Sequence, residues 1–205
     1  MKAKLKQITH IRNGYQFRGK IEPFDLVTGD GAAAPLPPGV VRVIQIKDID
    51  EDRRLHAGDL TPVRIDAAPE KYEARQGDVL FLVRGHRLFA TAITEPIRDA
   101  VATGYFFILR PMSGTILPGY LAWYINQPPF QAELRTYMKG THQPLVSRKD
   151  IENLRVEVPP LETQATIVAL EDLRLREQHL LASLRQKRSA LLSAISMQAV
   201  RGGHQ

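Results

Sequence analysis

The sequence predicts a mixed α+β fold, in which one domain of short strands and helices is followed by a single long C-terminal α-helix. Up to residue 158, β-branched and aromatic runs alternate with turns and show no regular strand–helix–strand repeat. From residue 161 to residue 201 the chain contains no glycine or proline, and strong helix formers dominate it. We therefore predict a folded domain over residues 1–158 and a helix over residues 159–205.

The strands of the predicted domain are separated by segments rich in turn-forming residues. Residues 4–11 fit either a short helix or a strand, and residues 12–20 fit a turn that leads into an exposed strand. The Gly-, Ala- and Pro-rich segment 28–39 predicts a loop. A tight corner is expected at Gly85. The clearest strand patterns lie at 40–46, 79–84, 87–93 and 104–111.

Three shorter helices are predicted before the long one. Residues 118–126 and 128–140 both begin at a proline, which is tolerated in the first helical turn, and Gly140 would end the second of these helices. Residues 147–154 begin with a serine, a common N-cap. Asp150 follows three positions later, in a pattern close to a capping box.

The long C-terminal helix carries an apolar seam. At about 1.5 Å per residue it would be roughly 60 Å long, which exceeds the span of a small domain. It either folds back on its own domain or forms a coiled coil with a second helix, and its length favours the coiled coil. In an antiparallel coiled coil, Glu177 of one chain would lie near Arg185 or Arg188 of the other and fix the register. The predicted dimerisation residues are Ile167, Leu170, Leu173, Glu177, Leu180, Leu181, Leu184, Arg188, Leu191 and Ile195.

The composition points to an acidic partner inside the cell. Twenty-eight Lys and Arg against 22 Asp and Glu give a formal net charge of +6, and nucleic acid is the commonest partner of such a chain. The absence of cysteine excludes disulfides and thiolate sites and is compatible with a reducing compartment. Neither a signal-peptide core nor a run long enough to span a membrane is present, so we expect a soluble, cytoplasmic protein.

The sequence contains no recognisable catalytic motif. The six histidines show no pair at metal-ligand spacing, and no phosphate-binding loop or nucleophile elbow occurs. The segment "NQPPF" is similar to the Asn-Pro-Pro-aromatic motif of amino-methyltransferases, but Gln127 separates Asn126 from the prolines. The simpler interpretation is that one helix ends there and the next begins. We therefore expect a binding protein that has no metal, no cofactor and no catalytic activity of its own.

Three stretches combine glycine with basic or amide side chains and are candidates for DNA contacts. Glycine lets the backbone approach a phosphate, while Arg, Gln, Asn and His can hydrogen-bond base edges. The stretches are "RNGYQFRGK" at 12–20, "VRGHR" at 83–87 and "KGTHQ" at 139–143. The predicted DNA-binding residues are Arg12, Asn13, Tyr15, Gln16, Arg18, Lys20, Arg84, His86, Arg87, Lys139, Thr141, His142 and Gln143.

Taken together, these segments give the chain a family resemblance. It resembles the DNA-specificity (S) subunits of type I restriction-modification systems through the ordered segments "RNGYQFRG", "VIQIKDI", "GDVLFLVRG" and "KGTHQPLVSRKDIENLRVEVPPLETQATIVAL". The last segment is the most specific. It joins Gly140-Thr141, a short helix, a strand at 156–158 and a Pro-Pro-Leu-Glu-x-Gln motif that opens an Ile-rich helix at Pro159–Ile167.

The resemblance implies a target-recognition domain over residues 1–158 and a conserved spacer and dimerisation helix over residues 159–205. S subunits usually have two such domains and two helices packed antiparallel, so this chain resembles half of one. A two-fold homodimer would again contain two target-recognition domains and would recognise a bipartite inverted repeat in double-stranded DNA. In this family, methyltransferase (modification) subunits supply the chemistry and a restriction subunit can join them.

Two other functions stay open at this stage. A coiled-coil adaptor that binds protein and has no DNA specificity would tolerate alanine at Arg18, Arg84 and Arg87. A methyltransferase or nuclease would form product from DNA with S-adenosylmethionine or Mg²⁺, and we expect none.

Overall fold

The computed structural model describes residues 1–25, 36–66, 69–140 and 144–202. These residues form two compact units, Met1–Ala165 and Thr166–Gln205. The first unit combines strands with short helices, and the second consists of the greater part of one long helix, α5 (Leu161–Gly202). The α+β class and the long C-terminal helix predicted from the sequence are confirmed.

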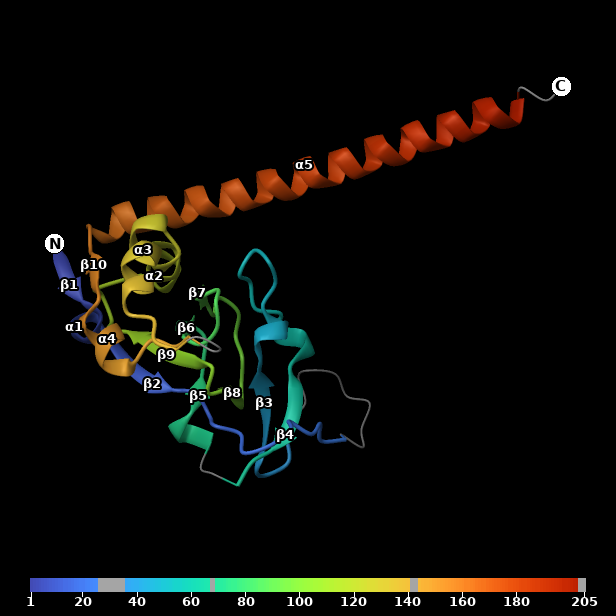
Figure 1. Ribbon diagram of the computed structural model, residues 1–205. Helices are drawn as coiled ribbons and strands as arrows, with labels where there is room; N and C mark the ends of the chain where they lie inside the picture. Colours follow the sequence, from blue (N-terminus) through green and yellow to red (C-terminus); the bar gives the residue numbers. More distant parts are fainter. Residues whose placement is uncertain (26–35, 67–68, 141–143, 203–205) are drawn as a thin grey trace. The chain divides into compact units, whose positions relative to one another are not determined.

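The first unit is built around two four-stranded sheets (Figure 1). One is antiparallel throughout, in the order β2-β9-β6-β7. The other has the order β4-β3-β8-β5, in which only the β3–β8 pair is parallel. The strand bounds are β2 (Thr9–Asn13), β9 (Phe106–Pro111), β6 (Val79–Leu82) and β7 (Phe89–Ala92) in the first sheet, and β4 (Thr61–Arg64), β3 (Val40–Ile44), β8 (Ala100–Ala102) and β5 (Glu73–Ala74) in the second.

The main core combines apolar side chains of both sheets. Leu80 of β6 and Ile108 of β9 are paired in register and fully buried, and Ile44 of β3 and Ala100 of β8 belong to the same cluster. All four residues of β6 are buried, as expected for a strand with a continuous apolar run. This core holds together segments that are far apart in the sequence. It thereby positions the site described below.

The two proline-initiated helices are α2 (Pro118–Ile125) and α3 (Pro128–Thr136). α2 lies against β6 and β7 and buries Leu121 and Ile125. The amide of Asn126 pairs with the backbone of Ala90, because its Nδ2 donates to the Ala90 carbonyl at 2.7 Å and its Oδ1 accepts from the Ala90 N–H at 3.0 Å. The "NQPPF" segment is therefore a helix end and a helix start, as predicted.

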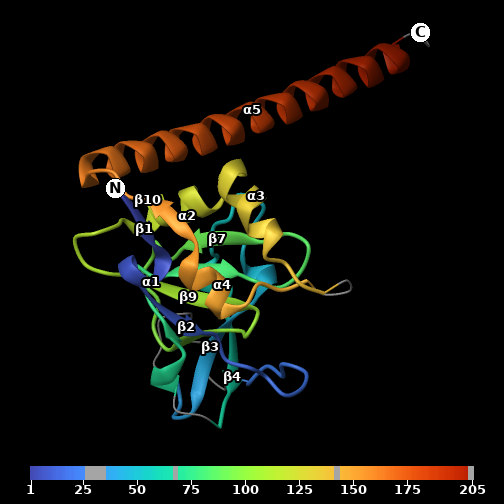
Figure 2. The same ribbon diagram turned by 60° about the vertical axis from the view of Figure 1, so that its left-hand side comes forward.

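The N-terminal residues pair with the strand that precedes α5. β1 (Lys2–Lys4) and β10 (Arg155–Glu157) form a two-stranded antiparallel sheet, which Figure 2 shows beside α1 (Leu5–Ile8) and α4 (Arg148–Asn153). The Val158 N–H donates to the Met1 carbonyl at 2.7 Å. Ser147 caps α4 as predicted, since its Oγ accepts from the Asp150 N–H at 3.3 Å. The single-turn helices η1 (Ile46–Asp48), η2 (Ala57–Asp59) and η3 (Pro69–Lys71) complete the unit.

Several predicted boundaries are wrong. Residues 4–11 contain both a helix and a strand rather than one of them, and the exposed strand into which the turn at 12–20 was expected to lead is absent from residues 14–25. The helix predicted over 128–140 ends at Thr136, because the backbone of Lys139 instead pairs with Leu145. The predicted loop at 28–39 falls largely outside the described residues. In the part of the chain that the structure describes, no helix is both long and apolar enough to cross a membrane.

Candidate nucleic-acid interface

The backbone brings parts of all three predicted DNA-binding stretches together. At the start of the first stretch, the Gly14 N–H donates to the Phe106 carbonyl at 3.0 Å. The neighbouring Tyr105 carbonyl accepts from the Val83 N–H, also at 3.0 Å, which attaches the second stretch. The Val83 carbonyl then accepts from the Val146 N–H at 3.1 Å, next to Leu145, whose backbone pairs with Lys139 of the third stretch. Segments that are far apart in the sequence thus meet at one end of the antiparallel sheet.

Gly14 is required for this convergence. A β-carbon at Gly14 would collide with the backbone carbonyl oxygens of Ala102 and Thr103. These are backbone atoms of the second sheet and its following turn, so they cannot move aside as the end of a flexible side chain would. Gly14 of "RNGYQFRGK" therefore serves close backbone packing in this structure.

A cavity of about 300 Å³ lies where the stretches meet, and we call it the recognition pocket. Asn13, Gln16 and Arg84 provide polar groups that match base edges, and the guanidinium of Arg84 lies 6.0 Å from the ring centre of the exposed Tyr105. The full lining is Asn13, Gly14, Gln16, Tyr72, Val83, Arg84, Gly104, Phe106, Phe107, Leu145, Val146, Ser147 and Arg148.

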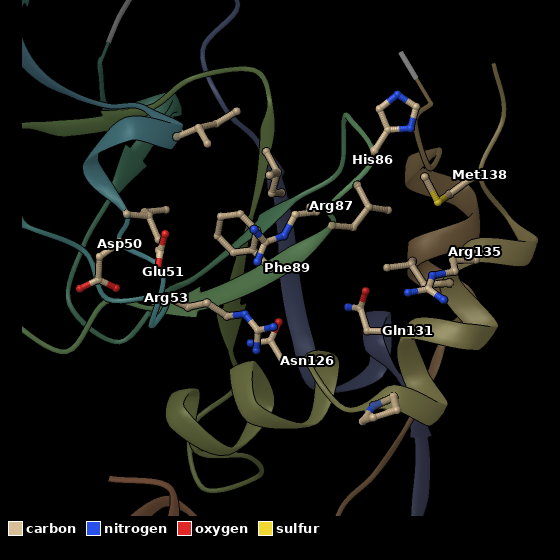
Figure 3. A pocket seen from close by; sticks show the side chains of 16 residues that line it. Asp50, Glu51, Arg53, His86, Arg87, Phe89, Asn126, Gln131, Arg135 and Met138 are labelled. Atoms are coloured by element: carbon tan, nitrogen blue, oxygen red, sulfur yellow. The ribbon is translucent and has the colours of Figure 1, made fainter. Parts of the chain in front are cut away.

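The tight corner at Gly85 divides the second predicted stretch between two cavities. Gly85 has a φ of +102°, and its N–H donates to the Pro144 carbonyl at 2.8 Å. Arg84 precedes the corner and lines the recognition pocket, whereas His86 and Arg87 line a separate cavity of about 550 Å³. Figure 3 shows His86 and Arg87 at this cavity together with Gln131 and Arg135, which the sequence did not single out.

The other predicted DNA-binding residues occupy varied positions. The ring of Tyr15 packs against Phe17 and Tyr72 at centroid distances of 4.7 and 5.2 Å, so much of it is engaged in the fold. Arg18 and Lys20 are exposed and lie outside the recognition pocket, and Lys139 is exposed as well. Thr141, His142 and Gln143 lie outside the described residues.

A third, more open cavity of about 660 Å³ is strongly basic, and we call it the basic groove. Arg12 is the one predicted residue in it. Arg110 on β9 faces His10 on β2 in register. Sequence reasoning missed the rest because no local pattern connects them. The lining is Lys6, Thr9, His10, Ile11, Arg12, Arg75, Arg110, Arg148 and Glu152.

Arg110 is fixed in the basic groove by a buried carboxylate. Its Nε and one terminal nitrogen donate to the two oxygens of Asp78, both at 2.7 Å, in a bidentate pair. Asp78 is fully buried, and it also accepts from the Arg75 N–H at 3.0 Å. The hydrogen bonds to Asp78 raise the pKa of Arg110, and the nearby charges of Asp78 and Glu73 act in the same direction against the effect of burial. Arg110 is therefore a rigidly held cation.

Gln164, in the first turn of α5, is anchored in the first unit. It is fully buried although it is polar. Its Oε1 accepts from the Leu117 N–H at 2.8 Å, while its Nε2 donates to the carbonyls of Pro159 at 2.8 Å and Thr115 at 3.3 Å. The glutamine of the Pro-Pro-Leu-Glu-x-Gln motif thus satisfies three backbone groups and joins the helix start to the turn before α2.

We expect Gln164→Ala to lower the free energy of unfolding by about 1–3 kcal/mol, because it leaves buried backbone groups without partners. Chemical denaturation, followed through the unfolding transition of the first unit, measures this decrease in stability. Thr163→Ala, one residue earlier and exposed, is the matched control and should change the stability much less. Equal stabilities of the two variants would contradict the anchoring role.

The predicted dimerisation residues on α5 include a row of exposed apolar side chains. From Leu170 to Ile195, the apolar members of the predicted seam have exposed fractions between 47% and 71%. Glu177 and Arg188 are exposed as well. Exposed leucines at heptad spacing are typical of a helix that pairs with another helix. Those with the largest exposed fractions are Leu170, Leu173, Leu180, Leu184 and Leu191.

Comparison with known proteins identifies the fold through structures alone. No protein-family model and no curated protein matches the sequence. The S subunit of a type I restriction-modification system from M. genitalium matches with a TM-score of 0.55 and 12% identity, over 90% of this chain and 41% of that one. The HsdS subunit from Thermoanaerobacter tengcongensis matches with a TM-score of 0.57 and 22% identity, over 86% and 37%.

A third match comes from a structure that addresses complex assembly and conformational transition of the type I R-M system. It has a TM-score of 0.59 and 21% identity, and it covers 95% of this chain and 43% of that chain. The chain thus spans about two fifths of the length of the proteins it matches. It has the fold of roughly one half of a type I restriction-modification S subunit, with one α+β domain followed by one long helix.

Proposed function

We propose that the chain is a DNA-specificity subunit of a type I restriction-modification system. In this proposal it pairs with a second copy through α5, reads a bipartite inverted repeat, and recruits methyltransferase subunits that carry out the chemistry. The observation that carries the proposal is the likeness to two S subunits over 86–90% of the chain. The chain itself then contributes recognition and no catalytic step.

The recognition pocket supports the DNA-reading part of this proposal. Arginine forms bidentate hydrogen bonds with guanine, and Asn or Gln does so with adenine, so Arg84, Asn13 and Gln16 supply suitable groups. Aromatic and aliphatic side chains, among them Tyr72, Phe107 and Leu145, line the pocket beside these polar groups. A pocket of this kind favours sequence-dependent binding over adhesion by charge alone.

The exposed seam of α5 supports the pairing. A helix of 42 residues whose seam leucines are exposed gains apolar burial when it packs against a second helix, at about 25 cal/mol for each Å² of apolar surface removed from water. Two identical chains related by a two-fold axis present two identical recognition pockets. Such a pair would read two half-sites in inverted orientation with a spacer between them.

Selection of bound duplexes from a random DNA pool tests the proposed function. The full-length chain, with modification subunits added, should enrich one interrupted inverted repeat. Incubation of the chain alone with DNA and S-adenosylmethionine, or with DNA and Mg²⁺, should yield no modified or cleaved product. Enrichment of no motif would contradict the proposal and would favour the adaptor function.

A further inference from the structure

We propose that the basic groove binds phosphate groups of the DNA backbone and supplies the sequence-independent part of the affinity, while the recognition pocket supplies the sequence preference. This inference rests on the proposed function, because it assigns two different tasks to two neighbouring surfaces of the same domain. Only Arg12 of the groove was among the residues selected from the sequence.

The charge of the groove suits a polyanion. Among the residues that the structure describes, five Lys and Arg side chains line it, against the carboxylate of Glu152. The buried Asp78 compensates one more of these charges, that of Arg110, so the groove keeps an excess of positive charge. The groove is also broad and open, at about 660 Å³, which suits an extended backbone better than an enclosed small molecule.

Two of the groove's cations are held in place before any ligand binds. Arg110 is clamped by Asp78 through two 2.7 Å hydrogen bonds. Arg148 donates to the Ile11 carbonyl at 2.9 Å and to Glu152 at 2.8 Å. Side chains fixed in this way give up little conformational entropy on binding, and the N–H groups not used in these hydrogen bonds can still donate to phosphate oxygens.

The groove and the recognition pocket share one lining residue. Arg148 lines both of them, and the adjacent strand residues Arg12 and Asn13 line the groove and the pocket respectively. In this proposal, a duplex that presents a base edge to Gln16 and Arg84 places backbone phosphates in the groove. In protein–DNA complexes, phosphate contacts position the duplex and base contacts specify the sequence, which is the division proposed here.

The double variant Lys6→Ala/Arg75→Ala tests the groove. Both side chains are exposed, so the fold should be retained. Fluorescence anisotropy with a labelled random-sequence duplex, from about 50 to 200 mM salt, should show weaker binding and a log–log salt slope smaller by about 0.9 for each phosphate that the variant no longer neutralises. The preference for the selected target over the random duplex should be unchanged, because both affinities fall by the same factor.

Arg98→Ala/Arg155→Ala is the matched control, since it removes the same charge from exposed positions outside the groove. A salt slope equal to that of this control, or a changed target preference, would overturn the inference. If the parent protein still prefers its selected target in that case, the groove inference fails and the proposed function stands. A parent protein that binds neither duplex at low salt would overturn both.

Discussion

The variant Leu181→Asp/Leu184→Asp is expected to be monomeric and to lose binding to a two-half-site DNA while keeping a folded first unit. Both leucines lie on the exposed seam of α5, and two buried carboxylates would face the same seam of the partner in a paired helix. Because the first unit of a single chain binds only one half-site, the affinity for the complete site should fall by at least about 10²-fold. Sedimentation and binding to matched one-site and two-site duplexes measure both effects.

The control for this variant is Gln186→Asp/Ser193→Asp. It adds the same charge to the same helix, but at two exposed positions on the face opposite the seam. This control should pair and bind as the parent protein does. If it dissociates equally, the effect arises from charge on α5 in general and the predicted seam is wrong.

The second large effect is expected at the ion pair of the buried Asp78 with Arg110, which lines the basic groove. Asp78→Asn removes the charge that compensates Arg110 and breaks a bidentate pair, and it should lower the free energy of unfolding by about 3 kcal/mol. Asparagine keeps one oxygen for the Arg75 N–H but replaces the other by an NH2 donor, so the measured decrease reports the loss of the whole bidentate pair with Arg110. Denaturation curves by circular dichroism provide the measurement.

A partly exposed ion pair in the same groove supplies the comparison. Glu152 accepts from Arg148 at 2.8 Å, with side-chain exposures of 30% and 51%. Glu152→Gln should therefore cost less than about 1 kcal/mol, because solvent screens this pair. If both variants are destabilised to a similar degree, burial does not distinguish the two pairs and the structural role given to Asp78 is wrong.

Local signals in the sequence predicted the helices well and the short strands poorly. The prolines at 118 and 128 and the cap at Ser147 place helix starts correctly, because each acts within one turn. β5 and β8 have two and three residues, which is too short for a period to be visible. β4 contains Pro62, which disfavours a strand in general and is tolerated here at the edge of its sheet.

The candidate site was only partly predictable for a related reason. Asn13, Gln16 and Arg84 carry glycines nearby, which marked them as candidates, and the fold brings them into one pocket. Arg110 has no such marker, because it reaches the basic groove through its cross-strand pairing with His10. The separation of Arg84 from His86 depends on the backbone turn at Gly85, which residue types alone do not specify.

Sedimentation equilibrium over a range of concentrations gives the solution mass of the 205-residue chain. This mass tests most directly whether two copies of the chain form a dimer. Pairing through α5 predicts twice the chain mass of 23.1 kDa at the higher concentrations, with dissociation on dilution. A mass of one chain at every concentration, for a protein that still selects an interrupted inverted repeat, would contradict the pairing on which the proposed two-site recognition depends.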